Sequence, residues 1–168
     1  MIWKPNVVVA AIVERDGKFL LVEERTDDGE IVLNQPAGHL DEGESLVAAV
    51  VRETLEETAW RFEPQALLGV YRWPHPVKGM TYLRFAFTGR AVRHEPERRL
   101  DHGIVRALWL TPEEIRASRA RHRSPLVERC LNDYLAGRRY PLDLLQDLDA
   151  GVVDKDSNSP QMRGGAES

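Results

Sequence analysis

The chain lacks three features that would each indicate a particular class of protein. It has one cysteine in 168 residues, Cys130, so no internal disulfide can form, and this usage fits a reducing compartment. No apolar run approaches the roughly 20 residues of a membrane-spanning helix, and Met1–Pro5 does not begin a signal peptide. The net charge of −4 leaves no positive excess for nucleic-acid polymers. We therefore expect a cytoplasmic globular protein that binds neither a membrane nor a nucleic-acid polymer.

Length and composition indicate one ordinary domain. A chain of 168 residues is long enough for a single hydrophobic core, and 30% charged residues is typical of globular proteins. From Gly151 onward glycine, serine, aspartate, asparagine and proline dominate, and no hydrophobic period continues. The sequence therefore predicts one domain over residues 1–150 and a flexible C-terminal tail over 151–168.

The hydrophobic pattern alternates irregularly between strands and helices. The expected strands are Val7–Val13, Phe19–Val22, Ile31–Asn34, Ala66–Trp73, Thr81–Thr88 and Ile104–Leu110. Asp16-Gly17 favours a type I′ hairpin turn between the first two. Thr111 suits the N-cap of a helix, and Ser124–Leu135 has the pattern of an amphipathic helix. We expect an α/β protein of the α+β kind, with helices packed around a mixed sheet.

Three glutamates near the end of another predicted helix are the most informative feature. Glu53, Glu56 and Glu57 stand at i,i+3 and i,i+4 spacing, so their carboxylates share one face. They repel one another, and the helix dipole is already negative at this end. A divalent cation would turn that cost into binding energy. The alternative is a solvated acidic face that pairs incidentally with Arg52.

The rest of this helix has simpler predicted roles. Val47, Val51 and Leu55 recur every fourth residue, and we expect them to face the core. Glu44 is placed to hold Arg52 by charge. The acidic stripe continues backward through Ala49, Val50 and Leu46, none of them charged, so we expect the carboxylates to face a partly covered cleft.

The residues that precede the helix fit a binding site. Gln35–Gly38 reads as an extended segment followed by a turn, and Gly38 permits a close backbone approach, so that its carbonyl can face a metal. Asp41 and Glu42 are interpreted as stabilisers of the helix start, because the dipole favours acids there.

The segment resembles the Nudix box, in which a glycine, five residues, a glutamate, seven residues and Arg-Glu-x-x-Glu-Glu follow in order. The matching positions are Gly38, Glu44, Arg52, Glu53, Glu56 and Glu57. Ala59 stands where the family usually has glycine, and Thr54 where it prefers an aliphatic residue. Neither departure removes a metal ligand, but Ala59 must avoid or tolerate a positive φ.

The resemblance extends along Met1–Asp149 to bacterial Nudix phosphatases, which act on nucleoside di- and triphosphates and on hydroxymethylpyrimidine diphosphate. The similar stretches are Asn34–Leu40, Leu83–Phe85, Arg123–Val127 and Gly137–Leu142. This resemblance implies a Nudix-type α/β/α sandwich with a mixed sheet, in which the box forms a loop, a helix and a loop.

The family pattern also implies a metal centre. Carried over residue by residue, the ligands of Mg²⁺, with Mn²⁺ as a possible substitute, are the Gly38 carbonyl, Glu53, Glu56 and Glu57. Either Glu53 or Glu57 would accept the proton of the attacking water, and Arg52, held by Glu44, would orient the carboxylates. Metal-bound water is already acidic, so a strong base is not needed.

Residues for substrate binding are less sharply indicated. Trp73 stacks on a ring of the substrate or forms part of the rim. Arg84 in an apolar strand needs a carboxylate or phosphate partner. His39 donates to a phosphate or stabilises a turn, and Asp101 is an extra acid near the metal or a loop cap. The arginine-rich segment 116–123 is a solvated helix end or an electropositive rim.

The sequence predicts a metal-dependent hydrolase of a small phosphorylated metabolite, active as a monomer or a homodimer. The alternative is a catalytically silent Nudix-like module that senses a nucleotide. Such modules usually lose glutamates of the box, and here all are present. An isomerase on a similar fold would need further acid–base residues that the sequence does not indicate.

Overall fold

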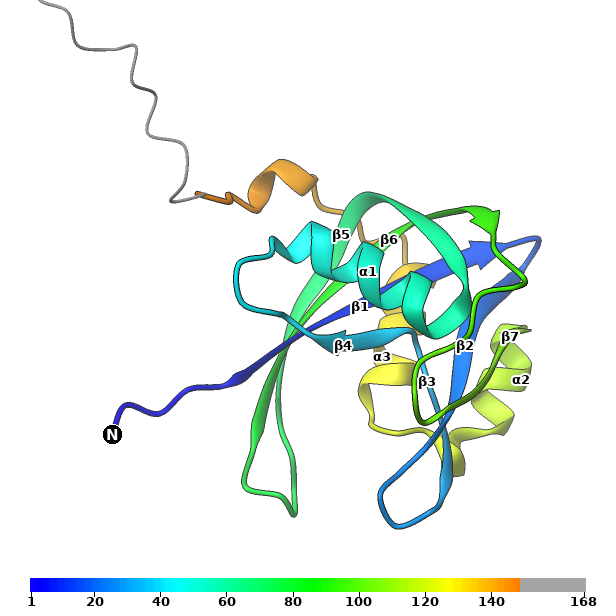
Figure 1. Cartoon of the computed structure of the whole chain (residues 1–168), viewed down its shortest axis with the longest axis horizontal. Helices are drawn as coiled ribbons and strands as arrows, with labels where there is room; N and C mark the ends of the chain where they lie inside the picture. The colour runs from blue at the N-terminus through cyan, green and yellow to red at the C-terminus, as the bar shows by residue number, and fades with distance from the viewer. Residues whose placement is uncertain (149–168) are drawn as a thin grey trace, which may run out of the picture.

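The computed structural model describes residues 1–148 (Figure 1). The predicted tail at 151–168 and the predicted domain boundary at residue 150 lie outside the described residues. Within residues 1–148, no helix is both long and apolar enough to cross a bilayer.

A mixed seven-stranded sheet forms the centre of the domain. Its main path runs β3-β2-β1-β6-β5, while β4 pairs with β1 and β7 pairs with β2. The strands are β1 (Asn6–Arg15), β2 (Lys18–Arg25), β3 (Ile31–Asn34), β4 (Ala37–His39), β5 (Trp60–Pro74), β6 (Thr81–His94) and β7 (Ile104–Leu110). Strands β1 and β6 run parallel and the other pairs antiparallel, so the predicted mixed sheet is confirmed.

Helices cover both faces of the sheet (Figure 1). They are α1 (Leu46–Thr58), α2 (Pro112–Ala117) and α3 (Leu126–Leu135), with short 3-10 turns at Arg119–Arg121 and Leu142–Leu144. Alternate residues of β1 point to opposite faces. Ala10 and Ile12 pack against residues of α2 and α3, whereas Val9, Ala11 and Val13 pack against α1. The α/β/α sandwich is thereby confirmed.

Local turn and cap signals were read correctly. Asp16 and Gly17 both have positive φ, 52° and 78°, as a type I′ turn requires. Helix α2 begins with a complete capping box between Thr111 and Glu114. Helix α3 begins at Leu126, two residues later than predicted, because Pro125 forms its N-cap.

The strands are longer than the hydrophobic pattern indicated. Strand β2 was predicted to end at Val22 but continues to Arg25, and β5 and β6 extend into polar segments. Ion pairs between neighbouring strands join these ends, for example Arg90 Nη2 to Glu63 Oε1 at 2.9 Å. Hydrophobic alternation does not mark a strand end that consists of charged residues, so the predicted strands were too short.

The interpretation of α1 needs two corrections. Its buried residues are Ala49, Val50, Glu53, Thr54, Glu57 and Thr58. Of the predicted core face Val47, Val51 and Leu55, only Val47 packs against the core, and all three are only partly buried. Small residues let the helix lie close to the sheet, and the carboxylates continue the same face toward its C-terminal end.

The start of α1 also differs from the prediction. The N-cap is Ser45, whose hydroxyl accepts from Ala48 N at 3.0 Å, and the first turn contains no acid. Asp41 and Glu42 precede the helix and do not stabilise its first turn as expected. At the other end, Ala59 adopts φ 60° and ψ 16°, so it tolerates the left-handed conformation usual for glycine.

Replacing the N-cap should destabilise the fold. Ser45→Ala removes the acceptor for Ala48 N, and we expect the free energy of unfolding to fall by about 1 kcal/mol. Urea denaturation measures this change. Ser45→Thr, which preserves a capping oxygen, and Glu42→Gln should each remain close to the wild type. A loss in Glu42→Gln as large as in Ser45→Ala would show that the acids, and not Ser45, stabilise the helix start.

Candidate active site

The C-terminal half of α1 lies directly beside β4, and Gly38 permits this approach. Gly38 pairs with Val9 of β1, so it belongs to a strand and not to the predicted turn. A Cβ atom placed on Gly38 would overlap the carboxylate of Glu53. Glycine is therefore required here because a charged side chain is pressed against the backbone.

Glu57 is the most deeply buried acid of the site. Its carboxylate accepts a hydrogen bond from Ala37 N at 3.0 Å, and the residue is 7% exposed. Burial raises the pKa of Glu57 to about 9, and the negative charges of Glu24, Glu53 and Asp101 add to the effect. Burial also raises the pKa of Glu53, although Arg52 opposes the shift. In the absence of a cation, Glu57 therefore keeps its proton at neutral pH.

Arg52 fixes the positions of several acids at once. Its Nε donates to Glu44 at 3.0 Å, and its Nη1 donates to Glu53 at 2.9 Å and to Glu56 at 3.1 Å. Its Nη2 donates to the backbone carbonyl of His39 at 3.1 Å. These contacts raise the pKa of Arg52, and the Arg52 guanidinium lowers the pKa of Glu44. The predicted Glu44–Arg52 pair is therefore present, and Arg52 orients two carboxylates.

Asp101 approaches the same acids from a distant part of the chain. Its backbone N–H donates to the carbonyl of Glu56 at 2.9 Å, which anchors the loop before β7 to the end of α1. Carboxylate oxygens of Glu53, Glu56 and Asp101 lie within 4.8 Å of one another. Asp101 was expected to be an extra acid near the metal or a loop cap, and its carboxylate lies beside the acids of α1. A donor set made only of oxygen atoms suits a hard divalent cation such as Mg²⁺ or Mn²⁺.

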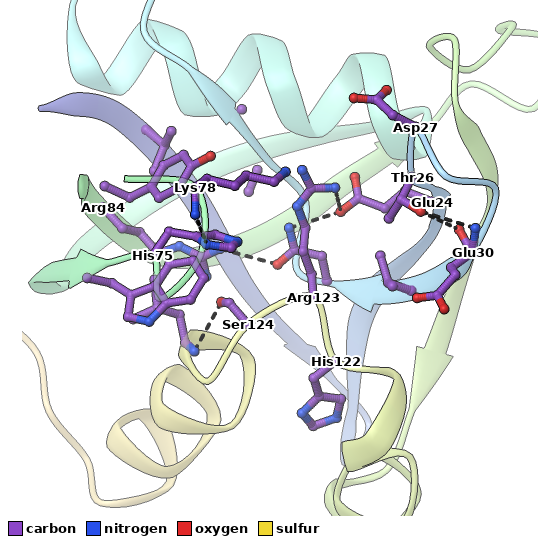
Figure 2. Close-up of a pocket in the computed structure, with 18 of the residues that line it drawn as sticks. Glu24, Thr26, Asp27, Glu30, His75, Lys78, Arg84, His122, Arg123 and Ser124 are labelled. Carbon is purple, nitrogen blue, oxygen red and sulfur yellow. Dashed lines mark hydrogen bonds and ion pairs between the residues drawn. The ribbon is translucent and has the colours of Figure 1, made fainter. Parts of the chain in front are cut away.

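A cleft of about 830 Å³ opens beside these acids. Gly38, Glu53 and Glu57 line one end, and an aromatic group formed by Trp73, His75 and Tyr82 lines another part. Figure 2 shows the cleft between α1 and the beginning of α3, with side chains from several strands and loops pointing into it. One ligand can therefore contact the acids and the aromatic group together.

Trp73 lines the cleft as part of the aromatic group. Its ring stacks on Tyr82 across β5 and β6, with centroids 5.8 Å apart, and contacts His75 at 5.1 Å. The ring nitrogen Nδ1 of His75 accepts from the backbone of Val77 and Lys78, which shapes the β5–β6 loop. The aromatic group is thus held in place by its own neighbours and presents a partly buried Trp73 to the cleft.

Arg84 and His39 have different surroundings in the cleft. His39 is exposed at the rim, and its backbone carbonyl makes the contact with Arg52. Arg84 is buried in β6 and donates to Gln35 Oε1 at 3.0 Å and to Asn34 Oδ1 at 3.2 Å. Of the two predicted partners of Arg84, a carboxylate or a phosphate, no carboxylate pairs with it within residues 1–148, where its partners are neutral amides.

Sequence reasoning missed Glu24, which also lines the cleft. It accepts from Arg123 at 2.9 Å and from Asn34 at 3.4 Å, and its charge contributes to the raised pKa of Glu57. The missed signal was a strand that continues past Val22 with acids at its end. Glu24 reaches the site only because β2 is long.

The arginine-rich segment is largely neutralised by acids. Arg119 pairs with Glu128, and Arg121 pairs with Glu23. Arg123 pairs with Glu24, as described above. These three arginines connect the segment to α3 and β2, so they do not form a free electropositive rim.

Comparison with known proteins agrees with this geometry. Residues 3–130 match the family model described as the NUDIX domain. The phosphatase NudJ of Escherichia coli K12 is 40% identical over 146 residues, which span 87% of this chain and 94% of that protein. The family match at residues 3–130 spans α1 and all seven strands.

Solved structures give the same result. A NUDIX hydrolase from Nitrosomonas europaea is 56% identical, with a TM-score of 0.86 over 88% of this chain and 99% of that one. A MutT NUDIX hydrolase from Burkholderia pseudomallei shares the fold, at 22% identity and a TM-score of 0.66 over 78% of this chain and 98% of that one. The chain belongs to the Nudix family and is a hydrolase.

Proposed function

We propose that this hydrolase cleaves phosphoanhydride bonds in small metabolites and depends on Mg²⁺, with Mn²⁺ as a substitute. The observation that carries the proposal is a group of acids beside Gly38. Glu53 and Glu57 line the cleft, and carboxylate oxygens of Glu53, Glu56 and Asp101 lie within 4.8 Å of one another. Repulsion and burial make this arrangement unfavourable without a cation. The substrates we infer are nucleoside di- and triphosphates or hydroxymethylpyrimidine diphosphate, in keeping with the similarity to a phosphatase.

The residues fit a hard cation. The Gly38 carbonyl and the carboxylates of Glu53, Glu56 and Glu57 would hold it, and Asp101 would add a further oxygen. When bound, a divalent cation polarises phosphate oxygens and makes a coordinated water more acidic. The protein supplies the position of these oxygens, because Arg52 holds Glu53 and Glu56 from one side.

Proton transfer falls to one of the two buried carboxylates. Glu53 or Glu57 would accept the proton of the attacking water once the charge of the cation has ionised them. Both are buried and line the cleft, so either carboxylate is positioned to reach a water bound there. Glu44 has a supporting role, since it holds the guanidinium of Arg52.

The aromatic end of the cleft suits a ring. Trp73 and Tyr82 together offer a flat surface on which a base or a pyrimidine can stack. A volume of about 830 Å³ matches pockets for small molecules.

A substrate panel in Mg²⁺, with products identified, tests this proposal. It should contain nucleoside di- and triphosphates, hydroxymethylpyrimidine diphosphate, dinucleoside polyphosphates and nucleotide sugars. Absence of any phosphoanhydride cleavage product with this panel would refute the proposed activity.

Glu57→Gln should nearly abolish turnover and leave the fold intact. The amide keeps the shape of the side chain, but it cannot be ionised and so can neither hold the cation nor accept a proton. We expect kcat to fall by about a thousandfold or more. Steady-state kinetics and circular dichroism measure the two effects. Glu42→Gln, a change at an exposed acid outside the cleft, is the matched control, and wild-type activity in Glu57→Gln would refute the assignment.

Binding of Mg²⁺ should tighten as the pH rises toward the pKa of Glu57, about 9. Below that pKa the carboxyl holds a proton that the cation must displace, so each unit of pH can change the affinity by up to about tenfold. Calorimetric titration over this range measures the affinity. In buffers of different ionisation enthalpy, the same titration also detects the released proton. An affinity that does not change with pH would mean that the site is already ionised.

A further inference from the structure

Arg84 is a buried cation without a buried anion. The residue is 5% exposed, and its two recorded hydrogen bonds end on the neutral side-chain oxygens of Gln35 and Asn34. Its Nε has no hydrogen-bond partner among residues 1–148. An uncompensated charge in the interior is costly unless something neutralises it. Since Arg84 lines the cleft, the missing partner can come from a ligand.

The first turn of α3 adds positive potential to the same part of the cleft. Ser124 and Leu126 line the cleft at the N-terminus of this ten-residue helix, where the Ser124 hydroxyl accepts a hydrogen bond from Leu126 N at 3.2 Å. Gln35 joins the two elements, because it accepts from Arg84 and donates through Nε2 to the carbonyl of Val127 at 2.8 Å. A helix N-terminus and a guanidinium that converge on one space favour an anion.

Arg84 also lies within reach of a ligand held at the acids. Val8 of β1 pairs with His39 of β4 on one side and with Arg84 of β6 on the other. The backbones of Arg84 and His39 are therefore two strand spacings apart, roughly 10 Å, with both side chains on the face of the sheet opposite to α1. The same cleft is lined by these two residues and by Glu53 and Glu57 of α1. Gly38, beside Glu53, is the neighbour of His39. The cleft thus has an acidic end and a cationic part that one phosphorylated molecule can span.

We propose that Arg84 and the first turn of α3 form an anion subsite that binds a phosphate group of the substrate separately from the metal. This inference rests on the proposed function, because it takes the ligand to be a phosphoanhydride. The subsite selects compounds with at least two phosphoryl groups, one at the acids and one at Arg84. Compounds with a single phosphoryl group can occupy only one of the two positions.

Binding of methylenediphosphonate, which has no hydrolysable anhydride bond, tests the proposal without a metal. Calorimetric titration is done with the full chain in buffer freed of cations by chelating resin. We expect the wild type to bind, and Arg84→Gln to bind about tenfold more weakly or worse, because a charged donor pair is lost. Arg72→Gln removes an exposed arginine of the neighbouring strand and should bind like the wild type.

Two results would overturn the subsite: no binding by the wild type, or equal binding by wild type and Arg84→Gln. Binding of the unphosphorylated hydroxymethylpyrimidine that depends on Arg84, without binding of the diphosphonate, would also overturn it, since Arg84 would then recognise a ring. If Arg84→Gln fails to fold, the Nε–H resonance of Arg84 in the wild type gives the answer. It should shift on addition of the diphosphonate, and an unchanged resonance would contradict the proposal.

The same experiments separate this inference from the proposed function. If the protein binds the diphosphonate through Arg84 but hydrolyses nothing in Mg²⁺, the subsite is supported and the proposed activity is refuted. If wild type and Arg84→Gln hydrolyse diphosphates with the same KM, the proposed activity is supported and the subsite is refuted.

Discussion

The structure depends on the contact between the carboxylate of Glu53 and the backbone of Gly38. That contact brings the C-terminal half of α1 against β4 and forces the acids of the helix toward the interior. Two of these acids have raised pKa values because they are buried, and Glu57 is the extreme case. A fold selected only for stability would place apolar residues there. A cation that neutralises the charge would offset the free-energy cost of burying these carboxylates together.

The charges of the cleft are divided between its parts. Glu53 and Glu57 line one part, Glu56 and Asp101 lie close to Glu53, and Arg52 holds Glu53 and Glu56 in position. Arg84 and the first turn of α3 supply positive charge elsewhere. A phosphorylated metabolite with its cation is complementary to this division, because the cation meets the acids and the phosphate meets the guanidinium. The aromatic surface at Trp73 suits a ligand that also contains a ring.

Much of the fold and part of the site could be predicted from the sequence, because the signals were local. The Asp16-Gly17 turn and the Thr111 cap depend on neighbouring residues, and the spacing of the acids in α1 is a property of one helix. The rest depends on packing between distant segments. Which face of α1 is buried is decided by small residues against the sheet, and Glu24 reaches the cleft only through a strand end that ion pairs stabilise.

The most direct test of the central claim, that the buried acids are arranged around a divalent cation, is an anomalous diffraction experiment on crystals soaked in Mn²⁺. The account predicts one or more anomalous peaks within bonding distance of the Gly38 carbonyl and of the carboxylates of Glu53, Glu56 and Glu57. A map without a peak there, or with these side chains turned apart into solvent, would contradict it.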